Sequence, residues 1–122
     1  MTANNAHTRK AKGNKYERDI AEMYRNKLFP LAQRMPTSGA MLLHKGDILK
    51  GEIDTWIDEC KCQETVKLWE WWKQAVEQCN ETQRPALHIK RGYSESLTVM
   101  RTDDYFKLRE RVKELEGDHG QL

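Results

Sequence analysis

The chain has 122 residues, of which 33% are charged and 38% are hydrophobic, and its formal net charge is +2. This length supports one compact domain with a core of modest size. No apolar run is long enough to span a bilayer and no signal-peptide pattern opens the chain, so we expect neither a membrane protein nor a secreted one. The odd number of cysteines, three, favours free thiols in a reducing compartment, and we therefore expect a cytoplasmic protein.

The cysteines also raise the alternative of a zinc site. Cys60 and Cys62 lie one residue apart, and together with Cys79, His44 and His88 they could form a zinc set. The spacing contains no CxxC pair, which zinc sites commonly use. A buried free cysteine is common in folded proteins, so we predict structural thiols and no zinc.

The start of the chain is basic. Four cationic residues precede the first acidic residue, Glu17: Arg9, Lys10, Lys12 and Lys15. Residues 1–12 show no apolar periodicity, so we predict a flexible basic arm. Such an arm is either simply solvated or follows the phosphates of a nucleic acid.

A first helix is predicted over residues 14–31, with Asn14 as its N-cap and Pro30 at its end. Its apolar stripe consists of Tyr16, Ile20, Met23 and Leu28. Glu17 lies three residues after Asn14, at the capping-box position, which is a purely structural interpretation. The same turn also places Glu17 at the edge of the core-facing stripe, from which its carboxylate could reach a site at a sheet edge.

Strand patterns follow the first helix. Residues 33–40 predict a short strand that leads into a loop, and residues 47–62 predict a hairpin with its turn at residues 50–52. In that hairpin Asp47 and Glu59 both lie toward the open end. We therefore expect these two carboxylates to be close in space without being directly paired.

The second half of the chain predicts a helix, two strands and a last helix. These segments are residues 65–80, 86–90, 97–101 and 102–116. The second helix has an apolar stripe of Trp69, Trp72, Val76 and Cys79, which we predict to be core, and Leu68 and Trp71 widen it so that one aromatic could be left for a partner surface. The stripe of the last helix is Tyr105, Leu108, Val112 and Leu115. The order helix, strand, hairpin, helix, strand, strand, helix predicts an α/β domain with a small mixed central sheet flanked by helices. We expect the domain over residues 13–116 and a flexible tail over residues 117–122.

Alternation along the strand that ends the hairpin separates two kinds of side chain. Glu59, Lys61 and Gln63 share one face, whereas Cys60 and Cys62 share the other. A row of acid, base and amide backed by small apolar thiols is typical of an active-site strand that lies on a core. We predict that the thiols pack against the second helix.

Two clustered carboxylates beside a lysine can support hydrolysis of a phosphodiester. Asp47 and Glu59 offer the oxygen ligands that a hard cation such as Mg²⁺ prefers, with the backbone carbonyl of Cys60 as a further ligand. Lys61 could orient or help to deprotonate the attacking water and stabilise developing charge. Glu17 could position that water or help to hold a second ion.

These motif residues resemble the PD-(D/E)xK nuclease superfamily. Gly46-Asp47 corresponds to its Pro-Asp element and Glu59-Cys60-Lys61 to its (D/E)xK element. The segment Gly13-Asn14-Lys15-Tyr16-Glu17-Arg18-Asp19 is similar to the G-x-x-x-E-R-(D/E) helix of archaeal Holliday-junction resolvases and related small phage endonucleases. Arg34, Ser38 and Gly39 match the Arg and the Ser-Gly loop of that branch. The resemblance spans residues 13–101.

The resemblance implies a restriction-endonuclease-like fold and a Mg²⁺-dependent DNA endonuclease in which Mn²⁺ can substitute. It implies selectivity for Holliday junctions or other branched DNA, action as a homodimer in a bacterial, archaeal or phage-infected cell, and no small-molecule cofactor. The candidate pairing surfaces are the exposed parts of residues 69–72 and the last helix. The expected catalytic residues are Lys61, Glu17, Gln63 and Ser38, and the expected metal ligands are Asp47, Glu59 and the Cys60 carbonyl. The expected DNA contacts are Arg9, Lys10, Lys12, Lys15, Arg34, Lys90 and Arg91.

Three alternatives remain open. The chain could be an inactive DNA-binding module with the same fold, although the intact set of Asp47, Glu59 and Lys61 argues against this. It could be a helical interaction protein with a Trp-rich surface, although the strand patterns argue against that. Asp54 is the nearest rival to Asp47 as a ligand, but it lies five residues before Glu59 with the wrong face parity.

Overall fold

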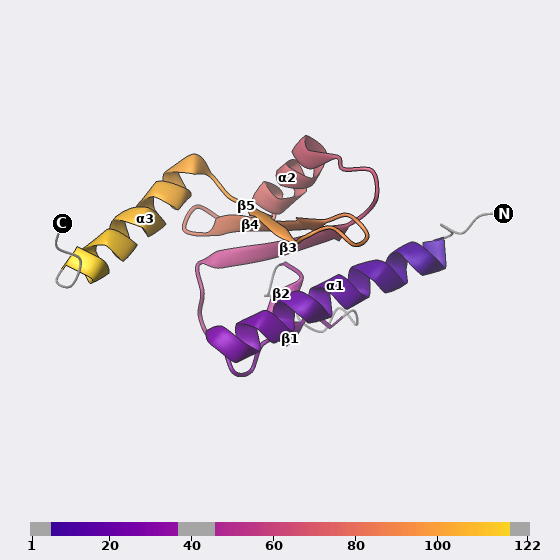
Figure 1. Ribbon diagram of the computed structural model, residues 1–122, viewed down its shortest axis with the longest axis horizontal. Helices are drawn as coiled ribbons and strands as arrows, with labels where there is room; N and C mark the ends of the chain where they lie inside the picture. The colour runs from indigo at the N-terminus through magenta and orange to yellow at the C-terminus, as the bar shows by residue number, and fades with distance from the viewer. Residues whose placement is uncertain (1–5, 37–45, 118–122) are drawn as a thin grey trace.

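The computed structural model describes residues 6–36 and 46–117 and places them in three helices and five strands. In chain order these are α1 (Ala6–Lys27), β1 (Gln33–Arg34), β2 (Ile48–Leu49), β3 (Trp56–Cys62), α2 (Leu68–Glu77), β4 (Arg84–Lys90), β5 (Leu97–Val99) and α3 (Thr102–Gly117). Figure 1 shows the central strands between α1 and α2, with α3 extending away from them. The order of elements confirms the predicted α/β arrangement.

The central sheet consists of β3, β4 and β5 in that order. β3 and β4 are parallel, with Glu59 opposite Leu87 and Lys61 opposite Ile89, because α2 forms the crossover between them. β5 returns antiparallel to β4, so the sheet is mixed as predicted. The short strands β1 and β2 form a separate antiparallel pair.

The predicted hairpin over residues 47–62 is wrong in its pairing, because β2 pairs with β1. The chain before β2 nevertheless lies beside β3, since the amide of Asp47 donates to the carbonyl of Asp58 at 2.8 Å. Gly46 makes this approach possible. Its φ is +88°, and a Cβ at this position would lie 2.7 Å from the Asp58 carbonyl oxygen. A larger residue there would push Asp47 away from β3.

Two apolar clusters pack on opposite faces of the sheet. The α1 side holds Tyr16, Ile20, Ala21, Ile48 and Cys60, with Tyr24 and Cys62 packed against them. The α2 side holds Trp71, Ala75 and Leu87. The thiols of β3 therefore pack against α1, and the prediction that they face the second helix is wrong. The alternation was predicted correctly, but the polar face of β3 is the one nearer α2, where Glu59 accepts a hydrogen bond from Gln78.

The first helix begins earlier than predicted. α1 starts at Ala6, so part of the segment expected to be a flexible arm is helical. Asn14 lies in the interior of α1 rather than at its start, and its side-chain oxygen accepts a hydrogen bond from Arg34 at 2.8 Å. The alanines Ala6 and Ala11 and the basic residues before Gly13 are good helix formers, which explains the extension. The capping-box interpretation of Glu17 is therefore wrong.

The buried face of α2 differs from the predicted stripe. Trp71 and Ala75 are buried, whereas Trp69 is 79% exposed. The helix starts at Leu68, and its N-cap, Lys67, makes no capping hydrogen bond through its side chain. Three tryptophans within one helical turn, Trp69, Trp71 and Trp72, allow more than one apolar face. Contact with Leu87 of β4 selects the face that contains Trp71.

The apolar stripe of α3 is exposed. Its four residues, Tyr105, Leu108, Val112 and Leu115, are each at least 41% exposed. The beginning of the helix is held to the body by Asp104, which is buried and forms an ion pair with Arg84 at 3.7 Å. Within residues 6–36 and 46–117, no helix is both long enough and apolar enough to cross a membrane.

Candidate active site

β3 presents the acid and the base of the candidate site. Glu59 is 7% exposed, and its carboxylate accepts a hydrogen bond from the side-chain amide of Gln78 at 2.6 Å. Lys61, two residues along the strand, is half-buried on the same face. Gln78 lies at the C-terminal end of α2, so that helix supports Glu59 from behind. The sequence analysis did not identify Gln78, because nothing local in the sequence marks this contact across 19 residues.

Asp47 approaches β3 from its free edge. Its carboxylate accepts a hydrogen bond from the backbone amide of Cys60 at 2.7 Å, and its own amide donates to Asp58. Met35, next to β1, donates its amide to the carbonyl of Asp47 at 2.7 Å. Asp47 is therefore held from both sides by backbone hydrogen bonds, at the level of Glu59.

The carboxyl groups of Asp47 and Glu59 contact each other and share a hydrogen bond. Burial, followed by the nearby charge of Asp47, raises the pKa of Glu59 to about 7. Burial also raises the pKa of Asp47, although the Cys60 amide opposes this. A bound cation would relieve the competition for charge between the buried carboxyl group of Glu59 and the half-buried one of Asp47.

Glu17 of α1 joins the same group. Its carboxylate accepts a hydrogen bond from Arg34 at 3.2 Å. Burial and the charge of Asp47 raise the pKa of Glu17, whereas Arg34 and Lys61 lower it. The charge of Lys61 also lowers the pKa of Asp47 and of Glu59, so its ammonium lies within electrostatic reach of all three carboxyl groups. Residues from α1, from the segment before β2 and from β3 thus converge.

The possible metal ligands at the candidate site are mainly oxygen atoms. Asp47, Glu59 and the backbone carbonyl of Cys60 are donors suited to Mg²⁺, so the residues fit a hard divalent cation. In the described part of the chain, no group of three or more His, Cys, Asp or Glu side chains is arranged to hold a metal ion. A cation bound by these two carboxylates would therefore keep much of its water shell, as Mg²⁺ often does.

The residues 8–119 match the family described as Phage putative PDDEXK endonuclease. The chain belongs to this family. Membership of the PDDEXK endonucleases makes it a nuclease of the PD-(D/E)xK superfamily, and DNA is the substrate that such a family implies. No curated protein and no solved structure gives a significant match.

The other predicted site residues of this PDDEXK family member are placed differently. Gln63 is exposed and directly follows the last residue of β3. It lines a groove with Arg9, Lys12 and Lys67. Ser38 lies outside the described residues, so its predicted role stays a prediction. Gln63 is therefore grouped with basic side chains rather than with the carboxyl pair.

The predicted DNA contacts have different surroundings in the structure. Arg9 and Lys12 lie along the groove beside Gln63, whereas Lys15 forms an exposed ion pair with Asp19. Lys10 is exposed on α1, Lys90 is half-buried at the end of β4, and Arg91 is exposed after it. Arg34 bonds to Glu17 and Asn14, so in this state it orders the site rather than extending into solvent.

A second charged cluster lies on the opposite face of β3 and was missed in the sequence. Asp58 is almost completely buried and contacts the side chains of Lys50 at 2.5 Å, Tyr24 at 2.6 Å and His88 at 2.7 Å. Burial alone would raise the pKa of Asp58, but His88 and Lys50 together lower it. The sequence shows a run of acids around this strand, but it does not indicate which of them is buried.

The same cluster accounts for Asp54, the rival to Asp47. Asp54 bonds to Lys50 at 2.6 Å and accepts a hydrogen bond from the amide of Trp56. Lys50 also donates to the Trp56 carbonyl at 2.7 Å. Asp54 thus has a structural partner, which supports the choice of Asp47 as the acid beside Glu59.

Proposed function

We propose that the protein is a Mg²⁺-dependent DNA endonuclease that hydrolyses phosphodiester bonds at the site formed by Asp47, Glu59 and Lys61. The observation that carries this proposal is the pair of carboxyl groups, Glu59 buried and Asp47 half-buried, both with raised pKa, beside a lysine. Asp47, Glu59 and the Cys60 carbonyl would hold the cation, and Mn²⁺, which accepts the same ligands, would substitute. When bound, the cation polarises the phosphate and makes water more acidic.

The chain's own residues have distinct roles in this proposal. Lys61 orients the attacking water and stabilises the charge that develops on the phosphoryl oxygens. Glu17 holds that water by hydrogen bonding and is itself oriented by Arg34. Gln78 fixes the carboxyl group of Glu59 so that it faces Asp47. The basic groove with Arg9 and Lys12 contacts the phosphates of the strand next to the cleaved bond.

We further propose that the enzyme selects branched DNA, such as Holliday junctions, and acts as a homodimer, because resolving a junction requires two cuts. Support comes from the similarity of its motif residues to the resolvase branch. The three cysteines are all free, which supports action in a reducing cytoplasm of a bacterial, archaeal or phage-infected cell.

Cleavage assays on supercoiled, linear and branched DNA, with Mg²⁺ or with EDTA, test these proposals. We expect nicking or cleavage that requires the cation and is fastest on branched DNA. Glu52→Gln is a matched control for the acid variants, because Glu52 is an exposed acid in the same segment. Equal rates on all three DNAs would contradict only the proposed selectivity for branched DNA, not the nuclease activity. Tight DNA binding without cleavage under any divalent cation would instead support the inactive DNA-binding module.

A further inference from the structure

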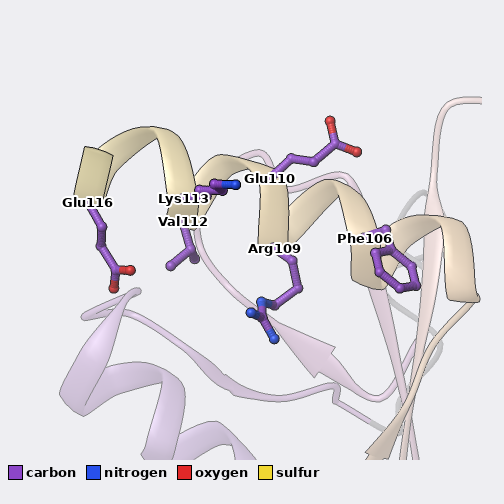
Figure 2. A pocket seen from close by; sticks show the side chains of 6 residues that line it. All are labelled: Phe106, Arg109, Glu110, Val112, Lys113 and Glu116. Carbon is purple, nitrogen blue, oxygen red and sulfur yellow. The ribbon is translucent and has the colours of Figure 1, made fainter. Parts of the chain in front are cut away.

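α3 carries an apolar face that no other element of residues 6–36 and 46–117 covers. Tyr105, Leu108, Val112 and Leu115 are 42%, 41%, 46% and 60% exposed. A hollow lined by Phe106, Arg109, Glu110, Val112, Lys113 and Glu116 runs along another side of the same helix and shares only Val112 with the apolar face (Figure 2). Figure 1 shows the helix extending from the end of β5 away from the sheet. The fold therefore presents this face to a partner.

The spacing of the apolar residues specifies the kind of partner. The positions 105, 108, 112 and 115 are separated by three, four and three residues, which are the a and d positions of two heptads. A β-branched residue at a, Val112, combined with leucines at d, Leu108 and Leu115, favours two strands. We propose that α3 pairs with α3 of a second copy of this chain in a parallel, two-stranded coiled coil.

Charges beside the apolar face select the parallel orientation. In a parallel pair, Arg111 at g lies next to Glu116 at e of the other copy, and the contact occurs twice by symmetry. In the antiparallel pair that matches Tyr105 with Leu115, Arg109 lies near Arg109 of the other copy and Arg111 near its own equivalent, which is repulsive. Arg111 bonds to Glu114 of its own helix at 3.0 Å, but both side chains are about two-thirds exposed, so exchanging this partner costs little.

The base of the helix gives the pairing a definite geometry. Asp104 is buried and forms an ion pair with Arg84 of β4 at 3.7 Å, so the start of α3 is anchored to the body while the apolar face begins one residue later. In a parallel pair both bodies lie at the same end of the coiled coil. This pairing would supply a surface for the proposed homodimer, but it rests on the fold and on α3 alone, not on cleavage.

Sedimentation velocity without DNA or metal, from low to high micromolar protein, tests the pairing. An interface of two heptads is small, so we expect a reversible, concentration-dependent dimer. Leu108→Glu places a charge in the centre of the apolar face and is expected to abolish the dimer at all concentrations. Phe106→Glu is the matched control, because it introduces the same charge two residues away, outside the a and d positions, and should leave the dimer largely intact.

The apolar face of α3 does not belong to the core, so at low concentration, where the wild type is monomeric, both variants should melt at the wild-type temperature, which separates loss of pairing from loss of folding. A wild-type protein that stays monomeric at the highest concentration would overturn the proposal. A Leu108→Glu protein that still dimerises like the wild type would overturn it as well. Neither result would affect the nuclease proposal, because cleavage of linear DNA by the same preparations reports on that site separately.

The orientation is tested with charge reversal and cross-linking. Arg111→Glu should weaken the dimer several-fold, and the added change Glu116→Arg should restore it, because the charge pair between the copies is re-formed with opposite signs. Leu115→Cys should form a disulfide between copies on oxidation, since a parallel pair places residue 115 next to its equivalent. No restoration in the double variant, together with no cross-link beyond the wild-type background, would overturn the parallel arrangement.

Discussion

Neighbouring carboxyl groups on β3 have opposite environments. Asp58 faces α1 and is surrounded by Lys50, His88 and Tyr24, and its cationic partners lower its pKa. Glu59 faces the other side and lies against Asp47, and burial with this like charge raises its pKa to about 7. Both side chains are buried, so burial alone does not distinguish them. The difference is that Asp58 has its countercharges within the chain, whereas the pair containing Glu59 lacks enough of them and is suited to an external cation.

The largest expected effect is on cleavage by variants of the carboxyl pair. Asp47→Asn or Glu59→Gln should reduce cleavage at least about a thousandfold, because each removes a charge needed to hold the cation. DNA affinity, measured in EDTA, should change at most a few-fold, since it depends mainly on lysine and arginine contacts to phosphate. Full-rate cleavage by either variant would remove that residue from the active site.

Variants of the cluster around Asp58, on the opposite face of β3, should change the stability of the protein instead. Lys50→Met leaves Asp58 buried with less countercharge, and we expect a loss of about 3 kcal/mol in the free energy of unfolding. Chemical denaturation of this variant beside Lys113→Met, on the exposed side of α3, measures the difference. Glu59→Gln should keep or increase the stability, because it relieves repulsion from Asp47. A Lys50→Met protein as stable as the wild type would mean that the two faces of β3 do not differ in this way.

Lys61 is expected to be sensitive to the shape of the side chain as well as to its charge. Lys61→Ala should lower the rate by about a hundredfold or more, and Lys61→Arg should recover little of it. A guanidinium cannot release its proton at working pH and is larger and planar. Single-turnover cleavage at saturating Mg²⁺ provides the measurement. Near-normal activity of the arginine variant would show that only positive charge is needed at this position.

Glu17→Gln tests a supporting position in the same group. We expect cleavage to fall about tenfold with an unchanged melting temperature, because Arg34 can still bond to the amide oxygen while the negative charge is lost. Glu22→Gln, an exposed residue on the same helix, is the matched control. Unchanged cleavage would mean that Glu17 only holds Arg34 in place and has no part in catalysis.

The pH dependence of stability should have opposite signs for the two carboxyl groups. The pKa of Glu59 rises from 4.5 to about 7 on folding. In metal-free protein its contribution to the free energy of unfolding is therefore present at low pH and is lost as the pH rises through about 7. The pKa of Asp58 is lowered from 3.8, so its contribution is present above that value and is lost as the pH falls. Melting in EDTA between pH 5 and pH 8 should show a decrease toward pH 8 that Glu59→Gln removes. A decrease of the same size in Glu59→Gln would assign it to another group.

Much of the fold was predictable because local rules dominate it. Apolar periodicity and turn residues gave the order of the helices and strands, and alternation along β3 separated Glu59 and Lys61 from Cys60. The errors concern long-range choices. Whether β2 pairs with β1 or β3, and whether Trp69 or Trp71 of α2 is buried, depends on which partners meet in three dimensions. Sequence periodicity does not contain that information.

The sequence by itself determined the chemistry available to this protein: two acids and a lysine at superfamily spacing, a glutamate on the first helix, and a heptad stripe on the last. The tertiary structure decided which of the neighbouring acids is neutralised within the chain and which remains in competition for charge. It also decided that the stripe of α3 is left uncovered. The physical reason is the same in each case: pKa values and burial depend on neighbours brought together from distant parts of the chain, whereas side-chain type and spacing are local properties.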